Sequence, residues 1–143
     1  MIKNKAGLIP YFIESDGTVK YMFMIPSKKL FGSKTPAIAK GGVESGETTL
    51  QAAVREAEEE LGLNRLNIDV STMQKVFEGH VMGRIKLQHL TVYTVRVLDK
   101  DDFGPTVDET FATIWLTAKG FKKAGYDHHK FIVQETRDRI EAK

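Results

Sequence analysis

The segment GGVESGETTLQAAVREAEEELGL (residues 41–63) joins a glycine-rich stretch to a strongly acidic helical pattern. Apolar residues recur in it at spacings of four, three and four, which is the period of one face of an α-helix. These residues are Leu50, Val54, Ala57 and Leu61. We therefore predict a helix over residues 47–61 that packs this apolar stripe on a sheet, with Gly62 as its C-terminal cap.

The same helix carries three glutamates, Glu56, Glu59 and Glu60, at positions i, i+3 and i+4. This spacing places them on one arc, directed largely away from the apolar stripe, while Glu58 projects elsewhere. Like charges at such spacings destabilise a helix by roughly 0.2–0.5 kcal/mol per pair, and the helix dipole disfavours anions near the C-terminus. Mg²⁺ or Mn²⁺ would relieve both effects, because these ions prefer carboxylate oxygens. The alternative is a solvated acidic face partly balanced by Arg55.

The stretch AKGGVESGE (residues 39–47) leads directly into the predicted helix. Glycines let a backbone approach a ligand closely, and helix N-termini attract phosphate groups. A plain surface turn is the alternative interpretation. Together with the acidic face, the stretch indicates phosphate contacts at one end of the helix and metal ligands along its side.

The composition is that of an ordinary globular domain. The chain has 143 residues, a length that suits one domain, with 41% apolar and 28% charged residues. No apolar run approaches the ~20 residues of a membrane span. The absence of cysteine fits a reducing compartment, and the net charge of +2 is too small to argue for nucleic-acid binding. We expect a cytoplasmic protein without a membrane segment or stable nucleic-acid binding.

Strand-like patterns lie on both sides of the predicted helix. The dipeptide Asp16-Gly17 between two apolar runs is a strong signal for a β-hairpin. We predict a loop over residues 27–46 and a second helix near the C-terminus, over residues 128–140. The predicted strands cover residues 6–14, 20–26, 75–81, 85–98 and 111–116. This order favours an α/β fold in which a mixed β-sheet is sandwiched between α-helices.

Residues 41–63 resemble the signature of the Nudix hydrolase family. The family signature is Gly, five residues, Glu, seven residues, Arg-Glu, an apolar residue, any residue, Glu-Glu, any residue, Gly and an apolar residue. All of its fixed positions are present between Gly41 and Leu63, namely Gly41, Glu47, Arg55, Glu56, Glu59, Glu60 and Gly62. The resemblance implies a single Nudix domain over residues 1–143, with an α/β/α sandwich.

The resemblance also implies roles for individual residues. Glutamates matching Glu59 and Glu60 bind two or three divalent ions, Mg²⁺ or Mn²⁺, and the one matching Glu56 binds metal or activates water. The backbone carbonyl of Lys40 completes the coordination, and Glu109 is the best match for a further glutamate from a later loop. The competitors of Glu109 are Asp101, Asp102 and Asp108. Either Glu109 or Glu56 would be the general base.

Two further residues are assigned supporting roles by the resemblance. Glu47 and Arg55 would hold the loop and the ligand helix in place, and Arg55 thereby belongs to the catalytic set. The start KGGVE (residues 40–44) is similar to members that cut dinucleoside polyphosphates or diphosphoinositol polyphosphates, although Ala39 stands where those often have proline. The candidate substrate-binding residues are Lys40, Gly41, Gly42, Glu44, Phe31 and Lys34.

The implied activity is metal-dependent hydrolysis of the diphosphate linkage in a nucleoside diphosphate joined to another moiety. Dinucleoside polyphosphates and ADP-ribose are the open substrate classes, and Phe31, Phe103 and Tyr126 are candidates to stack on a base. The four histidines show no metal spacing with one another, and we interpret them as structural or exposed. The alternatives are a Nudix-fold binding module without hydrolysis, a nucleoside triphosphate pool sanitiser or an isomerase. The expected partner is a small molecule, and a homodimer is possible.

Overall fold

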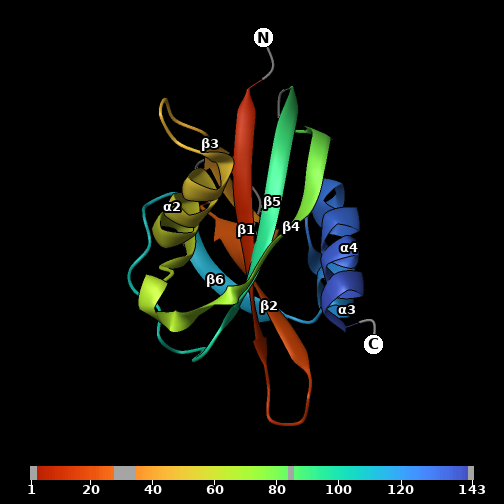
Figure 1. Ribbon diagram of the computed structural model, residues 1–143. Coiled ribbons are helices and arrows are strands. Elements are labelled where there is room, and N and C mark those ends of the chain that lie inside the picture. Colours follow the sequence, from red (N-terminus) through yellow and green to blue (C-terminus); the bar gives the residue numbers. More distant parts are fainter. Residues whose placement is uncertain (1–2, 28–34, 84–85, 142–143) are drawn as a thin grey trace.

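The computed structural model describes residues 3–27, 35–83 and 86–141. A twisted sheet lies in the middle, with α2 on one face and α3 and α4 on the other (Figure 1). The elements in chain order are β1 (Asn4–Ile13), β2 (Val19–Pro26), β3 (Ala39–Gly42), α2 (Thr49–Leu61), a 3₁₀ turn η1 (Arg65–Asn67), β4 (Ile68–Met82), β5 (Leu87–Val97), β6 (Thr110–Leu116), α3 (Ala118–Ala124), a 3₁₀ turn η2 (Asp127–His129) and α4 (Lys130–Glu141). The predicted α/β/α layering is confirmed.

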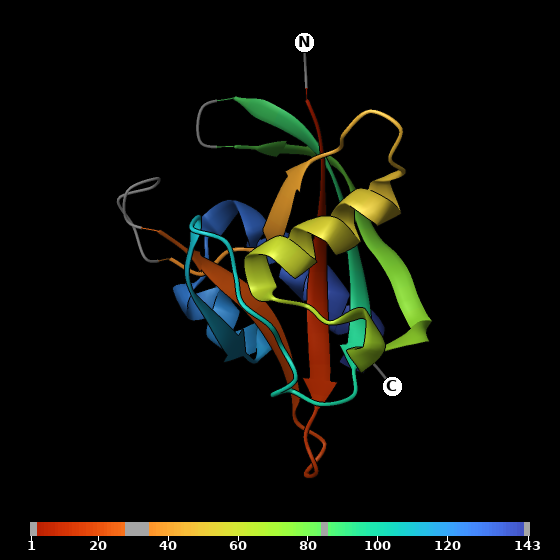
Figure 2. The ribbon, with the colours of Figure 1, turned by 90° about the vertical axis from the view of Figure 1, so that its left-hand side faces the viewer.

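The sheet is mixed, as predicted. Its strand order is β4-β5-β1-β2-β6, and β3 pairs with β1 beside this path. Strand β1 runs parallel to β5 and antiparallel to β2 and β3. One edge of β1 is shared, because residues 5–8 pair with β3 and residues 11–13 pair with β2. Strand β2 therefore leaves β1 after Tyr21, and β3 takes the place beside the first half of β1 (Figure 2).

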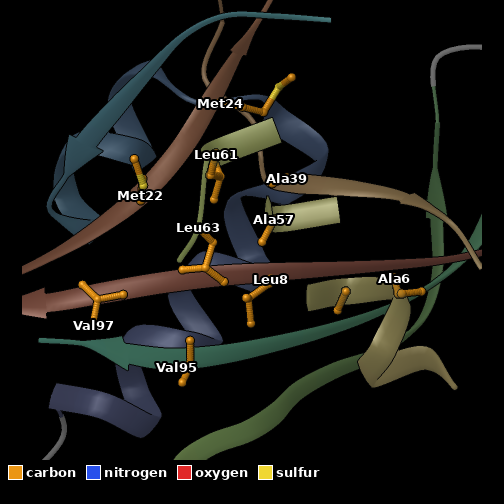
Figure 3. Close-up of a cluster of buried hydrophobic side chains, with 12 residues drawn as sticks. Ala6, Leu8, Met22, Met24, Ala39, Ala57, Leu61, Leu63, Val95 and Val97 are labelled. Atoms are coloured by element: carbon orange, nitrogen blue, oxygen red, sulfur yellow. The ribbon is translucent and has the colours of Figure 1, made fainter. Parts of the chain in front are cut away.

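Strict alternation along the central strands divides the interior into two layers. Leu8 and Met24 face α2, where they pack with Ala57 (Figure 3). The adjacent positions Ile9 and Phe23 face the opposite side and pack against α3 and α4. Each central strand thus buries both faces, which explains its nearly continuous apolar sequence.

Helix α2 begins two residues later than the sequence pattern predicts. Thr48 is its N-cap and forms a reciprocal capping box with Gln51, so that Glu47 lies outside the helix. The pattern TTLQ already contains this signal. Gly62 ends the helix in the left-handed conformation at φ 75°, which confirms the predicted C-terminal cap.

The buried face of α2 differs from the predicted stripe. Leu50 is 38% exposed, and the residues toward the sheet are Ala53, Ala57 and Leu61, with Ala52 beside them. Small alanine side chains let the helix backbone lie close to β1, so they take the central positions, whereas the larger Leu50 lies at the margin. Ala57 and Leu61 are buried as predicted, and the buried face is rotated from the predicted stripe, away from Leu50 and toward Ala52 and Ala53.

Other elements depart from the predicted boundaries. Residues 39–42 form strand β3 rather than a loop, because β1 offers them an edge to pair with. Strand β4 is longer than predicted, and the helix α3 was not predicted. Its only strong signal is the cap Thr117, whose side chain accepts from the Gly120 N–H, and an internal glycine lowers helix propensity. No helix in the described ranges has the length and apolar character needed to cross a membrane.

Candidate functional site

The guanidinium of Arg55 is the centre of a polar network between α2 and the segment before it. Its Nε donates to Glu47 at 2.7 Å, and an Nη atom donates to the Gly42 carbonyl at 2.9 Å. The other Nη donates to Glu56 at 2.9 Å and to Glu59 at 3.3 Å. The guanidinium lowers the pKa of Glu47, and the Glu47 carboxylate raises that of Arg55. The network fixes the helix against the strand that precedes it.

Glu56 is buried, which the sequence pattern did not predict. Its exposed fraction is 8%, and its carboxyl group lies against the backbone of Gly41. A Cβ atom at Gly41 would stand 2.2 Å from the Glu56 carboxyl carbon, so the helix approaches β3 this closely only above a glycine. Burial raises the pKa of Glu56, and Arg55 opposes this shift. Glu56 thus faces the sheet side of the helix, and not the solvent side that was predicted.

Glu60 is the most perturbed carboxyl group of the acidic face. It accepts a hydrogen bond from the Lys40 backbone N–H at 3.0 Å. Burial, with the charges of Glu56 and Glu109 added to it, raises the pKa of Glu60 to about 8. Burial also lowers the pKa of the Lys40 ammonium. Glu56 and Glu60 are therefore two neighbouring carboxyl groups whose ionised forms the fold disfavours.

The loop after β5 docks on the C-terminal end of α2. The last carbonyls of a helix have no partner within the helix and must bond elsewhere. Here the Gly104 N–H donates to the Gly62 carbonyl at 2.7 Å, and the Val107 N–H donates to the Glu59 carbonyl at 2.9 Å. A Cβ atom at Gly62 would stand 2.1 Å from the Gly104 oxygen. Gly62 therefore serves both the helix cap and the docking of this loop.

The same docking brings Glu109 to the acidic face. The Thr110 hydroxyl donates to the Glu60 carbonyl at 2.9 Å, and the Glu109 carbonyl accepts from the Ser27 N–H at 2.8 Å. The Glu109 side chain lines the same cavity as Glu60 and Lys40. Among the competing acidic residues, Asp102 instead accepts hydrogen bonds from Asn64.

The donor set suits a hard cation. Glu56 and Glu60 are neighbouring carboxyl groups with raised pKa values, and a divalent cation would favour their ionised forms. Within the described ranges, no three carboxylate or histidine side chains lie close enough together to enclose a metal ion. In this conformation Arg55 holds Glu56 and Glu59, so cation binding would require these two carboxylates to turn from the guanidinium.

A cavity of about 260 Å³ opens beside Glu60, where β2, β3, the β4–β5 hairpin and η2 meet. Its walls are mainly apolar and its polar groups are few. The apolar lining includes Met24, Ile38, Val81, Met82 and Tyr126. Its polar lining includes Lys40, Gln88 and His129, with Glu60 and Glu109 at the side that adjoins α2.

The remaining candidate residues divide into three groups. Lys40, Gly41 and Gly42 lie on β3 beneath the acidic face, whereas Glu44 is exposed and its nearest contact with Arg55 is 3.9 Å. Phe31 and Lys34 lie outside the described residues.

Of the candidate stacking residues, Tyr126 lines the cavity and Phe31 lies outside the described residues. Phe103 packs on Trp115 with ring centroids 5.8 Å apart.

Sequence reasoning missed two residues of the cavity, Gln88 and His129. Gln88 stands in a strand and accepts from the Lys40 ammonium at 3.3 Å. His129 is buried, as the structural interpretation of the histidines allowed, but it also lines the cavity. Neither residue carries a local signal, because the cavity is formed by elements far apart in the chain.

Comparisons with known proteins identify the family and the fold of this chain. The family model of the NUDIX domain matches residues 12–134. A search of curated proteins found no match.

Similar solved structures include a Caenorhabditis elegans Ap4A hydrolase in a binary complex, with 18% identity, a TM-score of 0.79 and coverage of 99% of this chain and 100% of that one. The Nudix hydrolase RenU of Mycobacterium smegmatis has 20% identity, a TM-score of 0.76 and coverage of 98% and 87%. The NUDIX domain of Shewanella oneidensis NrtR, complexed with ADP ribose, has 11% identity, a TM-score of 0.73 and coverage of 98% and 89%. At these identities the similarity shows the fold.

Proposed function

The chain belongs to the Nudix hydrolase family, and from this premise we propose that it is a divalent-metal-dependent pyrophosphohydrolase. Its substrate would be a nucleoside diphosphate joined to another moiety, such as a dinucleoside polyphosphate or ADP-ribose. The solved structures named above include one titled as an Ap4A hydrolase and one complexed with ADP ribose, which supports this substrate class.

The observation that carries the proposal is the burial of carboxyl groups on the acidic face of α2. Glu56 is buried and Glu60 has a pKa of about 8, so both carry a cost that packing alone does not repay. A protein with apolar or amide side chains at these positions would avoid this free-energy cost of folding. Such local conflicts are typical of functional sites.

The metal ligands in this proposal are Glu56, Glu59, Glu60 and Glu109, with the carbonyl of Lys40. Bound Mg²⁺ or Mn²⁺ would neutralise phosphate oxygens and lower the pKa of an attacking water. The Arg55–Glu47 pair holds the ligand helix in position, as the two hydrogen bonds between them indicate.

We assign Glu109 as the general base that takes the proton from the attacking water. Its side chain is exposed at the margin of the cavity, next to Glu60. Glu56, the other candidate, accepts a hydrogen bond from Arg55 at 2.9 Å, so this carboxylate is already engaged within the protein. The Lys40 side chain lies between the acidic face and the cavity, where an ammonium group favours a phosphate chain.

The test is product release from a substrate panel in Mg²⁺, Mn²⁺ or EDTA. The panel holds ADP-ribose, diadenosine polyphosphates, NADH, FAD, a diphosphoinositol phosphate and nucleoside triphosphates. We expect metal-dependent cleavage of a nucleoside diphosphate derivative, with a loss of at least about 100-fold in Glu59→Gln, because even residues that only support metal ligands contribute 10–100-fold.

The matched control is Glu58→Gln, which removes the same charge from the same helix. Glu58 pairs with Arg65 outside the acidic face, and its variant should keep wild-type turnover. Equal losses in both variants, or loss of folding in Glu59→Gln, would contradict the assignment. Ligand binding without cleavage of any substrate would indicate a binding module instead.

A further inference from the structure

His129 is a buried side chain, and only one of its two ring nitrogens, Nδ1, takes part in a hydrogen bond among the described residues. It is 2% exposed and belongs to η2. The Ile38 backbone N–H donates to its Nδ1 at 3.1 Å. Among the described residues no hydrogen bond engages Nε2, although His129 lines the cavity.

The bond from Ile38 fixes which nitrogen carries the proton. A neutral imidazole has one donor and one acceptor nitrogen, so Nδ1 as acceptor leaves Nε2 as an N–H donor. Burial lowers the pKa of His129 to about 3, which keeps the ring neutral at physiological pH. In the described part of the chain, no buried side-chain nitrogen or oxygen lacks a partner. The unbonded Nε2 must therefore be open to the cavity that the ring lines.

The cavity suits one planar group rather than a whole nucleotide. Its volume of about 260 Å³ is below the roughly 300–1,000 Å³ of pockets for complete small ligands. Met24, Val81, Met82 and Tyr126 supply apolar walls, and Lys40 marks the side on which phosphate would continue toward the acidic face. A flat heterocycle linked to a diphosphate meets both conditions.

The amide of Gln88 adds a second donor to the cavity lining. The Lys40 ammonium has no acceptor, so the amide must face it with Oε1. The NH₂ group of Gln88 then turns away from Lys40, toward the backbone of Gly83. Beside the carboxyl groups of Glu60 and Glu109, the polar lining of the cavity thus includes N–H groups, which pair with acceptors such as ring nitrogens or carbonyl oxygens.

We infer that this cavity is a nucleobase subsite and that the Nε2–H of His129 is a specificity-determining donor to an acceptor atom of the base. This inference rests on the proposed function for the nucleotide character of the ligand. It deepens that proposal by assigning the base-reading contact to a residue outside the Nudix signature.

The test uses two variants, each of which keeps the hydrogen-bonding role of one ring nitrogen of His129 and removes that of the other. His129→Asn places an amide oxygen near the position of Nδ1, which keeps the acceptor for Ile38 and removes the donor. His129→Gln places an amide NH₂ near the position of Nε2, which keeps the donor and removes the acceptor. The probes are AMP, GMP, CMP and UMP, with ribose 5-phosphate as the matched ligand without a base, all titrated calorimetrically in Mg²⁺.

We expect at least one nucleotide to bind the wild-type protein about 10-fold tighter than ribose 5-phosphate. His129→Asn should lose about 10-fold of that difference, since its partner on the base is left without a hydrogen bond, and His129→Gln should retain it. The affinity for ribose 5-phosphate should be unchanged in both variants.

Three outcomes would overturn the inference. One is equal affinity of wild-type protein for nucleotides and ribose 5-phosphate. Another is full base-dependent binding in His129→Asn, and the third is its loss in His129→Gln, which would assign His129 to the support of Ile38. Because these are binding measurements, they stand apart from the proposed function, which fails when no substrate in the panel is cleaved.

Discussion

The helices on the two faces of the sheet bury different kinds of side chain. On the α2 side, the helix buries the small residues Ala53 and Ala57 together with the carboxyl group of Glu56. On the opposite side, α3 and α4 bury large apolar groups such as Phe121 and Ile132. Apolar burial stabilises a fold in proportion to area, whereas a buried carboxyl group costs free energy.

This difference indicates that one face contributes mainly to stability and the other mainly to the candidate site. The C-terminal helices supply stability through packing, and α2 carries charged groups that packing on the other face must offset. Substitutions on the two sides should therefore separate stability from turnover.

The largest expected effect on stability is that of Phe121→Ala. The Phe121 ring is fully buried and packs on Phe23 with centroids 4.2 Å apart, so the variant should lose about 3–5 kcal/mol of unfolding free energy. Denaturant unfolding measures the loss, and turnover per folded molecule should stay near the wild-type value. The control on the other face is Leu50→Ala, at a half-exposed position of α2. A loss of similar size in this control would remove the proposed contrast.

An effect of opposite sign is expected for Glu60→Gln in metal-free protein. The folded-state pKa of about 8 lies above the ordinary value of 4.5, so the folded protein binds more protons than the unfolded one between these pH values. Its unfolding free energy therefore falls as pH rises through this window. Glu60→Gln removes this term and should raise the melting temperature in EDTA by a few degrees at pH 9, with little change at pH 4.5.

The control for this titration is Glu58→Gln, whose pairing with Arg65 lies outside the acidic face. A melting-temperature gain that is the same at pH 4.5 and pH 9 in Glu60→Gln would contradict the buried-carboxylate interpretation. So would an equal pH-dependent gain in the control.

The smallest expected effect is that of Tyr21→Phe. The Tyr21 hydroxyl donates to Glu141 at 2.6 Å and joins β2 to the end of α4. Removing one hydrogen bond at a partly buried site should cost about 0.5–1.5 kcal/mol, measured by the same unfolding experiment. A loss larger than that of Phe121→Ala would show that polar contacts, and not packing, stabilise the C-terminal side.

Elements with a strong local signal could be predicted from the sequence. The period of α2, its glycine cap and the Asp16-Gly17 hairpin follow from side-chain spacing and turn chemistry, which act within a few residues. The hairpin is present, with Gly17 at φ 91° and a hydrogen bond from the Glu14 N–H to the Thr18 carbonyl. The short helix α3 was missed because its glycine weakens the local signal.

The acidic face has a property that local sequence patterns do not predict, namely the depth at which each glutamate lies. The spacing of Glu56, Glu59 and Glu60 predicts one shared arc, but the depth of each side chain depends on the phase of the helix on the sheet. That phase is set by alanines against β1 and by the absence of a side chain at Gly41. It is a property of two surfaces in contact, which one segment does not encode.

By itself, the sequence determined that the chain forms an acidic, capped helix amid strands, because helical period, capping and turn chemistry are local. Only the tertiary structure decided that Glu56 is buried, that Glu109 reaches the acidic face, and that His129 lines a cavity. The docking of the loop on unpaired carbonyls of α2 places Glu109, and the bond from Ile38 orients His129 across 91 positions of the chain. Contacts between such distant residues leave no period in the sequence, so they exist only once the layers have packed.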